Sequence, residues 1–128
     1  MIASLTPVPA TAVESVYVHA PFCARRCFYC DFAVEVRRTG DVDGWLAAIR
    51  RELDGRLADG VVLAPRLRTL YVGGGTPSLL GPDAMDRLRE VLGDERCAGH
   101  AIEWTAEANP ESLTAEVARR WRQAGVTR

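Results

Sequence analysis

The stretch Cys23-Ala24-Arg25-Arg26-Cys27-Phe28-Tyr29-Cys30 places three cysteines in one short segment of the sequence. Three thiolates at this spacing can hold an iron–sulfur cluster, and a [4Fe–4S] cube with three protein ligands keeps one iron open for another molecule. An open iron indicates catalysis or ligand binding rather than simple electron storage. A disulfide cannot use three thiols, and Cys97 lies too far along the chain to be paired with one of them from sequence alone.

Zinc is the alternative metal for these thiols. Zinc sites usually combine pairs of cysteine or cysteine and histidine ligands. The only histidines here are His19 and His100, and His19 precedes Cys23 by four residues. The spacing therefore favours the cluster, and a small zinc-binding module remains the alternative.

The residues before the cysteines predict where the loop lies in the fold. Residues 16–20 alternate as a β-strand does, and Pro21 and Phe22 end the strand and open the loop. Cysteines that follow the carboxyl end of a strand lie where α/β folds place their active sites.

The rest of the chain has the pattern of strand then helix, three times. The predicted strands cover residues 16–20, 68–72 and 102–108, and the predicted helices cover residues 42–57, 82–93 and 114–123. Asp41 or Asp43 can cap the first helix. Repeated βα units predict an α/β fold with a parallel sheet and right-handed crossovers.

Three motifs in this order resemble the radical S-adenosylmethionine (radical SAM) superfamily, in the form found in the oxygen-independent coproporphyrinogen-III oxidase-like family. The motifs are Tyr17-Val18-His19-Ala20-Pro21-Phe22-Cys23 with Cys27 and Cys30, Gly73-Gly74-Gly75-Thr76-Pro77-Ser78, and Glu103-Trp104-Thr105-Ala106-Glu107-Ala108-Asn109-Pro110. The resemblance implies that residues 16–128 are the N-terminal half, with three βα units, of a partial (β/α)6 barrel. It also implies that the chain is an N-terminal fragment, so the rest of the barrel and a C-terminal domain would lie outside it.

The resemblance implies roles for individual residues. Cys23, Cys27 and Cys30 would be the ligands of a [4Fe–4S] cluster. The residues expected to contact S-adenosyl-L-methionine (SAM) are Tyr17, Tyr29, Gly74, Gly75, Thr76 and Glu107. No catalytic residue is assigned, and the roles of His19 and Cys97 stay open, as do the heme ligands and the oligomeric state.

The residues themselves give physical reasons for part of this assignment. Glycines after a strand let backbone approach a ligand closely, and no P-loop lysine follows them, which argues against phosphate binding. Alternation puts Glu103 and Glu107 on one face of the third strand. Burial of Glu107 without a partner would be costly, so we expect a cation or hydrogen-bond donors beside it. Tyr17 and Tyr29 have core packing as their alternative.

Residue 32 separates two branches of the family. The coproporphyrinogen-III oxidases carry a fourth cysteine two positions after the third, where this chain has Phe32. The pattern Cys-Asp-Phe resembles the heme chaperone branch, HemW, which implies heme as cargo. Its partners would be heme-acceptor proteins, some of them membrane-associated, and a low-potential electron donor. The alternative is an oxidase of porphyrin biosynthesis that decarboxylates its substrate through a 5′-deoxyadenosyl radical, and Phe32 argues against that enzyme activity.

Composition points to a cytoplasmic protein. The chain is 48% hydrophobic with a formal net charge of −1, so no polybasic surface indicates nucleic acid or anionic membrane. No stretch approaches the ~18 apolar residues that span a bilayer. Residues 1–15 lack the features of a secretory signal and are expected to form a flexible N-terminal segment.

Overall fold

The computed structural model describes residues 11–37, 39–99 and 101–128. Its centre is a parallel sheet with the strand order β1–β4–β5. The strands are β1 (Ser15–Ala20), β4 (Thr69–Gly74) and β5 (Glu103–Ala106), and each is followed by a longer helix: α1 (Val42–Ala58), α2 (Ala84–Leu92) and α4 (Ala115–Ala124). The prediction of three βα units with parallel strands is confirmed.

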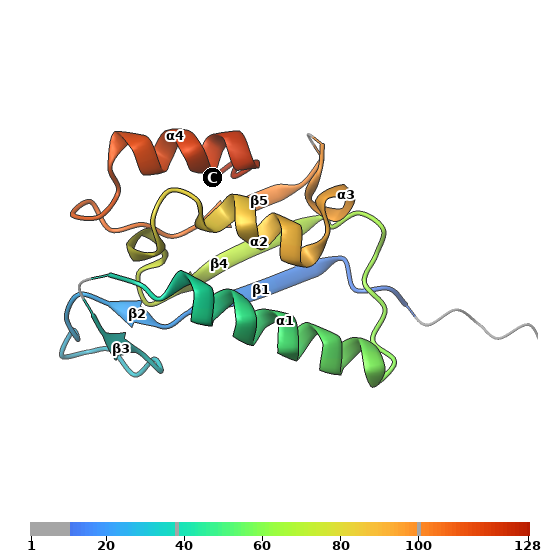
Figure 1. The fold of residues 1–128 in the computed structure, drawn as a ribbon, viewed down its shortest axis with the longest axis horizontal. Coiled ribbons are helices and arrows are strands. Elements are labelled where there is room, and N and C mark those ends of the chain that lie inside the picture. Colours follow the sequence, from blue (N-terminus) through green and yellow to red (C-terminus); the bar gives the residue numbers. More distant parts are fainter. Residues whose placement is uncertain (1–10, 38, 100) are drawn as a thin grey trace, which may run out of the picture.

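The helices cover one face of the sheet, as Figure 1 shows. Strand side chains alternate between faces, and the residues that point toward the helices, such as Leu70, Val72 and Trp104, are fully buried. Tyr17, on the other face, is 57% exposed. It pairs in register with Tyr71 of β4, so two tyrosines stand side by side on an open sheet face.

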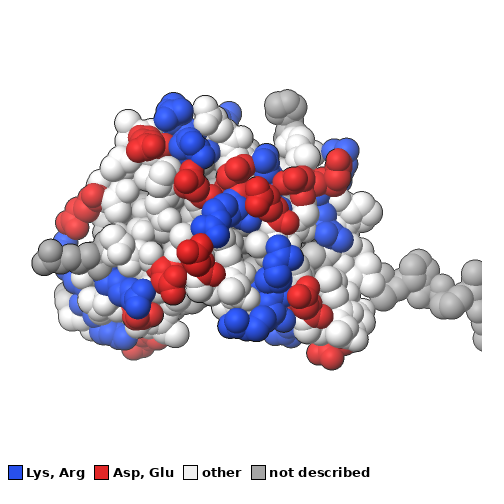
Figure 2. Space-filling model, in the orientation of Figure 1, with Lys and Arg blue, Asp and Glu red and all other residues white. Residues whose placement is uncertain are grey.

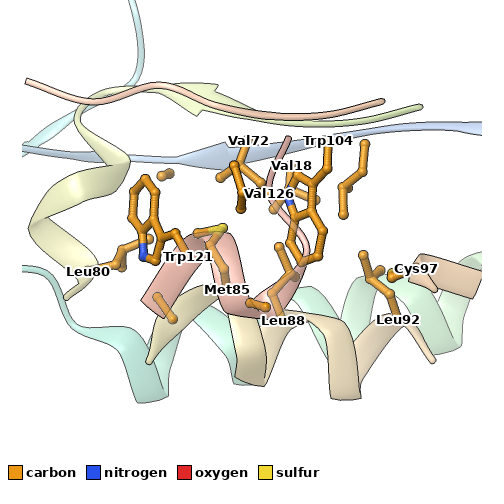
Figure 3. Packing of buried hydrophobic residues seen from close by; sticks show 14 of the residues in the cluster. Val18, Val72, Leu80, Met85, Leu88, Leu92, Cys97, Trp104, Trp121 and Val126 are labelled. Atoms are coloured by element: carbon orange, nitrogen blue, oxygen red, sulfur yellow. The ribbon is translucent and has the colours of Figure 1, made fainter. Parts of the chain in front are cut away.

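Large side chains from the sheet and from α1, α2 and α4 form the core. Trp104 lies between the sheet and α2, close to Leu88, and Met85 lies between Trp104 and Trp121 (Figure 3). Removing such a buried side chain typically costs about 3–5 kcal/mol. The core therefore fixes the strands against the helices, and the ends of β1, β4 and β5 are held in a defined relation to one another.

Several helix ends follow the sequence signals. Asp41 caps α1 by accepting a hydrogen bond from the amide of Gly44 at 3.0 Å. Thr114 caps α4 in the same way through Val117. The second helix begins at Ala84, two residues after the predicted start at Pro82, and the third strand ends at Ala106 rather than at residue 108. Ends of elements commonly vary by this much.

Four short elements escaped sequence prediction: β2 (Phe22–Cys23), β3 (Glu35–Val36), η1 (Pro77–Leu80) and α3 (Asp94–Cys97). The pair β2–β3 closes the cysteine loop at its base, where the amide of Arg37 donates to the carbonyl of Cys23 at 2.7 Å. Strands of two residues carry no periodicity, so only the folded chain reveals them.

The expected flexible segment, residues 1–15, lies mostly outside the described residues. In the described part of it, Val13 forms a β-bridge with Leu63, and Ser15 belongs to β1.

Positive and negative side chains are interspersed on the helix-covered face (Figure 2). No helix in the described ranges is long and apolar enough to cross a membrane.

Candidate cofactor site

One cavity of about 680 Å³ brings together three parts of the chain. The parts are the cysteine loop, the glycine turn after β4 and the segment that follows β5. The cavity is lined by Cys23, Cys27, Tyr29, Cys30, Phe32, Gly74, Gly75, Thr76 and Glu107, together with residues 24–25 and 108–111. All sequence-predicted site residues except Tyr17 therefore lie around one space.

The cysteine thiols are free and accessible. Cys27 is exposed, and Cys23 and Cys30 are half-buried. Among the described residues, no three Cys, His, Asp or Glu side chains are close enough to hold a single metal ion. A [4Fe–4S] cube binds its thiolates at separate corners, and Cys23, Cys27 and Cys30 lie in one loop.

The glycine turn packs directly on the start of the cysteine loop. A Cβ atom at Gly75 would lie 2.6 Å from the carbonyl oxygen of Phe22 and 3.0 Å from Sγ of Cys23. The amide of Gly75 donates to Ala20 at 2.7 Å, and the Thr76 hydroxyl lies 3.8 Å from Sγ of Cys23. Only glycine fits at residue 75 without moving the loop that carries the first thiol.

The glycine turn can bind a ligand through its carbonyl oxygens rather than through its amide hydrogens. The amides of Gly75 and Thr76 donate to carbonyls of Ala20 and Phe22. The amide of Gly74, a residue with φ of 108°, donates to Oε2 of Glu107 at 3.2 Å. With these N–H groups already paired, a positively charged donor such as an ammonium is the complementary ligand group.

Glu107 is held by a residue that the sequence interpretation missed. Tyr71 donates its hydroxyl hydrogen to Oε1 of Glu107 at 2.6 Å, and this hydrogen bond is the main cause of the raised pKa of Tyr71. The expectation that Glu107 meets hydrogen-bond donors is confirmed, although its side chain is exposed. Strand alternation places Tyr71 on the same sheet face as Tyr17. This alternation was the sequence signal that could have identified Tyr71 as a neighbour of the site.

Tyr17 is not among the residues that line this cavity. It lines a second cavity, of about 660 Å³, between β1 and α1. Its hydroxyl is 3.0 Å from Nδ1 of His19, and its ring centroid is 5.9 Å from that of Tyr71. Burial, followed by the charge of Glu107, raises the pKa of Tyr17. The structure thus connects Tyr17 to the site through His19 and Tyr71 and not through the cavity wall.

Tyr29 lies on the exposed surface of the cysteine loop. Its side chain is 76% exposed, which rules out the core-packing alternative in this structure. Hydrogen bonding with Cys27 is the largest cause of its raised pKa.

Arg25 and Glu111 form an ion pair at 3.0 Å that joins the cysteine loop to the segment after β5. Both partners are well exposed, so the pair contributes little stability.

Cys97 belongs to the core rather than to the site. It ends α3 with 3% exposure, and burial raises the pKa of its thiol to about 11. At pH 8 only about 0.1% of such a thiol is thiolate, the reactive form.

In cluster-free protein we expect iodoacetamide to modify Cys27 while Cys97 reacts only after denaturation or as the pH approaches 11. Mass spectrometry of labelled peptides measures this, and native labelling of Cys97 as fast as Cys27 would contradict it.

A family model described as the Radical SAM superfamily matches residues 17–128. With the cysteine loop, the glycine turn and the parallel sheet in place, the chain belongs to the radical SAM superfamily. It is similar to the heme chaperone HemW of Mycobacterium tuberculosis (strain CDC 1551 / Oshkosh), with 43% identity over 97% of this chain and 32% of that protein. It is also similar to heme chaperone HemW of Bacillus subtilis (strain 168), with 33% identity over 91% of this chain and 30% of that protein.

A solved structure shows the same arrangement of elements. Coproporphyrinogen III oxidase (HemN) from Escherichia coli, described as a radical SAM enzyme, superposes with a TM-score of 0.73 at 27% identity. The match covers 92% of this chain and 27% of that one. The chain thus spans about a third of the length of the curated relatives it matches. Membership of the superfamily implies a [4Fe–4S] cluster and SAM as cofactors.

Proposed function

We propose that this chain is the cluster-binding and SAM-binding part of a heme chaperone, a protein that binds heme and transfers it to acceptor proteins. Residues 16–128 would form the first part of its radical SAM core domain, in a longer cytoplasmic protein. Similarity to HemW proteins from two organisms supports this reading. Heme-acceptor proteins, including membrane-associated ones, and a low-potential electron donor would be its partners.

The observation that carries the choice of chaperone is Phe32. It stands where the coproporphyrinogen-III oxidases of the family have a fourth cysteine, and it lines the cavity beside Cys30 with 60% of its side chain exposed. A phenyl ring supplies no thiolate at this position. The alternative function is oxygen-independent coproporphyrinogen-III oxidase, and similarity to the HemN structure is the observation that keeps it open.

The residues around the cavity suit the two cofactors of the superfamily. Cys23, Cys27 and Cys30 would hold the cluster, which when bound can supply an electron for reductive cleavage of SAM. The carbonyls of Gly74 and Gly75 would accept hydrogen bonds from an ammonium group. Glu107, fixed by Tyr71 and by the amide of Gly74, would accept from hydroxyl or ammonium donors of SAM. Thr76 and Tyr29 would complete the wall.

Loss of the Tyr71 hydroxyl tests the role of Glu107. In Tyr71→Phe the ring stays and Glu107 loses its shortest hydrogen bond, so the carboxylate is free to swing away from the cavity. A hydrogen bond to a charged group is worth about 1.5–3 kcal/mol, so we expect SAM to bind about tenfold or more weakly. Isothermal titration with the reconstituted protein measures this affinity. Unchanged affinity in Tyr71→Phe would contradict the proposed role of Glu107.

Heme and porphyrinogen titrations distinguish the two functions. The full-length protein that contains this sequence is reconstituted anaerobically with iron and sulfide. One sample is titrated with heme, and another receives coproporphyrinogen III, SAM and reductant. The chaperone predicts stoichiometric heme binding without porphyrinogen turnover. Conversion to protoporphyrinogen would overturn the chaperone and establish the oxidase despite Phe32.

A further inference from the structure

We propose that His19 is a positioning residue, which fastens the outgoing limb of the cysteine loop, residues 30–34, to β1 and to the glycine turn. This inference rests on the proposed function, because it concerns how the loop presents the Cys30 thiolate to a cluster. His19 lies near the end of β1, opposite Gly73 in the parallel ladder. Its ring does not line the cavity with the cysteines.

Two hydrogen bonds hold the imidazole at both nitrogens. Nε2 of His19 lies 2.9 Å from the carbonyl oxygen of Ala33, and Nδ1 lies 3.0 Å from the hydroxyl of Tyr17. A carbonyl can only accept, so Nε2 carries a proton. In the neutral ring Nδ1 is then an acceptor, and Tyr17 is the donor that fills it. The tautomer and orientation of the ring are set by this pair of partners.

The glycine turn holds the ring from a third side. A Cβ atom at Gly74 would lie 2.4 Å from Cε1 and Nδ1 of His19, so the ring lies directly against the Gly74 backbone. The backbone of His19 is fixed as well, because Nε1 of Trp45 in α1 donates to its carbonyl at 2.8 Å. His19 is therefore anchored to the sheet and to α1, and it can serve as a rigid point of attachment.

The limb that His19 attaches is held by a few hydrogen bonds and not by burial. Asp31, Phe32 and Ala33 are all exposed, so burial contributes little to their position. Ala33, which accepts the hydrogen bond from His19, lies between Cys30 and β3 in the sequence. The bond therefore holds the loop between its last cysteine and the β2–β3 pair at its base. The edge of the Phe32 ring faces the imidazole, with centroids 6.4 Å apart. Arg26 also donates to the carbonyl of Val34 at 3.3 Å, and the amide of Cys30 donates to the carbonyl of Cys27 at 3.1 Å. His19 adds the bond at Ala33 that ties this limb to β1.

The same residues connect the loop to Glu107. Tyr17 donates to His19 and packs its ring against Tyr71, whose hydroxyl binds Glu107. The contacts run without a break from Ala33 through His19, Tyr17 and Tyr71 to the carboxylate. His19 therefore helps to fix the separation between the Cys30 thiolate and the proposed SAM contact.

Three variants of the full-length protein test this inference. His19→Leu has a similar size and no hydrogen bonds, His19→Gln keeps an N–H that can reach Ala33, and Tyr17→Phe removes the donor to Nδ1. Circular dichroism checks that each variant folds. In the cluster-free protein, trypsin cleavage at Arg25 and Arg26 reports the order of the loop. We expect cleavage about five to ten times faster in His19→Leu, as for the loss of a net hydrogen bond, and near the wild-type rate in His19→Gln.

The reconstituted proteins give a second measurement. His19→Leu should alter the electron paramagnetic resonance (EPR) spectrum of the reduced cluster and weaken the spectral response to SAM, with recovery in His19→Gln. Wild-type cleavage rates and spectra in His19→Leu would overturn the inference, as would an equal defect in the leucine and glutamine variants. If the wild-type protein binds no cluster, the proposed function fails, while the cleavage rates still decide whether His19 positions the loop.

Discussion

Replacement of Cys27 by alanine is expected to abolish the iron–sulfur cluster. The side chain is exposed and contributes no packing, so the fold should persist while one of three thiolate ligands is lost. Two thiolates cannot hold a cube that already has one open iron. We expect iron content to fall from about four per chain to below about one, with loss of the brown absorption of the cluster. Iron and sulfide analysis after anaerobic reconstitution measures both.

Cys97→Ala is the matched control for this experiment. It removes the one cysteine that lies in the core and should cost about 1 kcal/mol of stability, with the iron content unchanged. Retention of a full cluster in Cys27→Ala would contradict the three-cysteine site. Loss of the cluster in a folded Cys97→Ala protein would do the same, because it would make the buried thiol a ligand.

Gly75→Ala is expected to have the second largest effect. The new Cβ atom would meet the carbonyl oxygens of Phe22 and Ala20 at 2.6 and 2.8 Å, and both are backbone atoms that cannot rotate away. Overpacking of this kind costs about 1–3 kcal/mol, and it pushes the glycine turn from the cysteine loop. We expect SAM affinity to fall at least about tenfold, because the carbonyls that we propose as SAM contacts move with the turn. Calorimetric titration and thermal unfolding measure the two effects.

Gly55→Ala provides the control for the added methyl group. Gly55 lies within α1, and a Cβ atom there would have no neighbour within 4 Å. Alanine in place of an exposed helical glycine stabilises by about 0.5–1 kcal/mol. SAM affinity should not change. Wild-type SAM affinity in Gly75→Ala would show that the close packing of turn and loop is not needed for binding.

The architecture could be predicted from sequence because each element carries its own signal. Trp45, Ile49 and Leu53 recur at helical spacing along α1, and residues 16–20 alternate as a strand. Parallel strands end at one edge of a sheet, so motifs that follow successive strands must meet there. The cysteines, Gly74 to Thr76 and Glu107 do line one cavity.

What the sequence did not reveal depends on contacts between distant segments. In the sequence Tyr71 has the pattern of an ordinary strand residue. Only the structure shows that its hydroxyl binds Glu107, 36 positions away. His19 reads as part of a motif until its bond to Ala33 is seen. The SAM contact expected of Tyr17 stays a prediction. Its hydroxyl lies beside His19 and its ring beside Tyr71, and it is not among the residues that line the cavity.

EPR spectroscopy of the reduced, reconstituted full-length protein, recorded with and without SAM, tests the three-cysteine site most directly. A cube with three thiolate ligands keeps one iron for an outside molecule, so the spectrum of a reduced [4Fe–4S] cluster should change when SAM is added. A cluster spectrum that SAM leaves unchanged, or a colourless protein that retains zinc, would contradict the account.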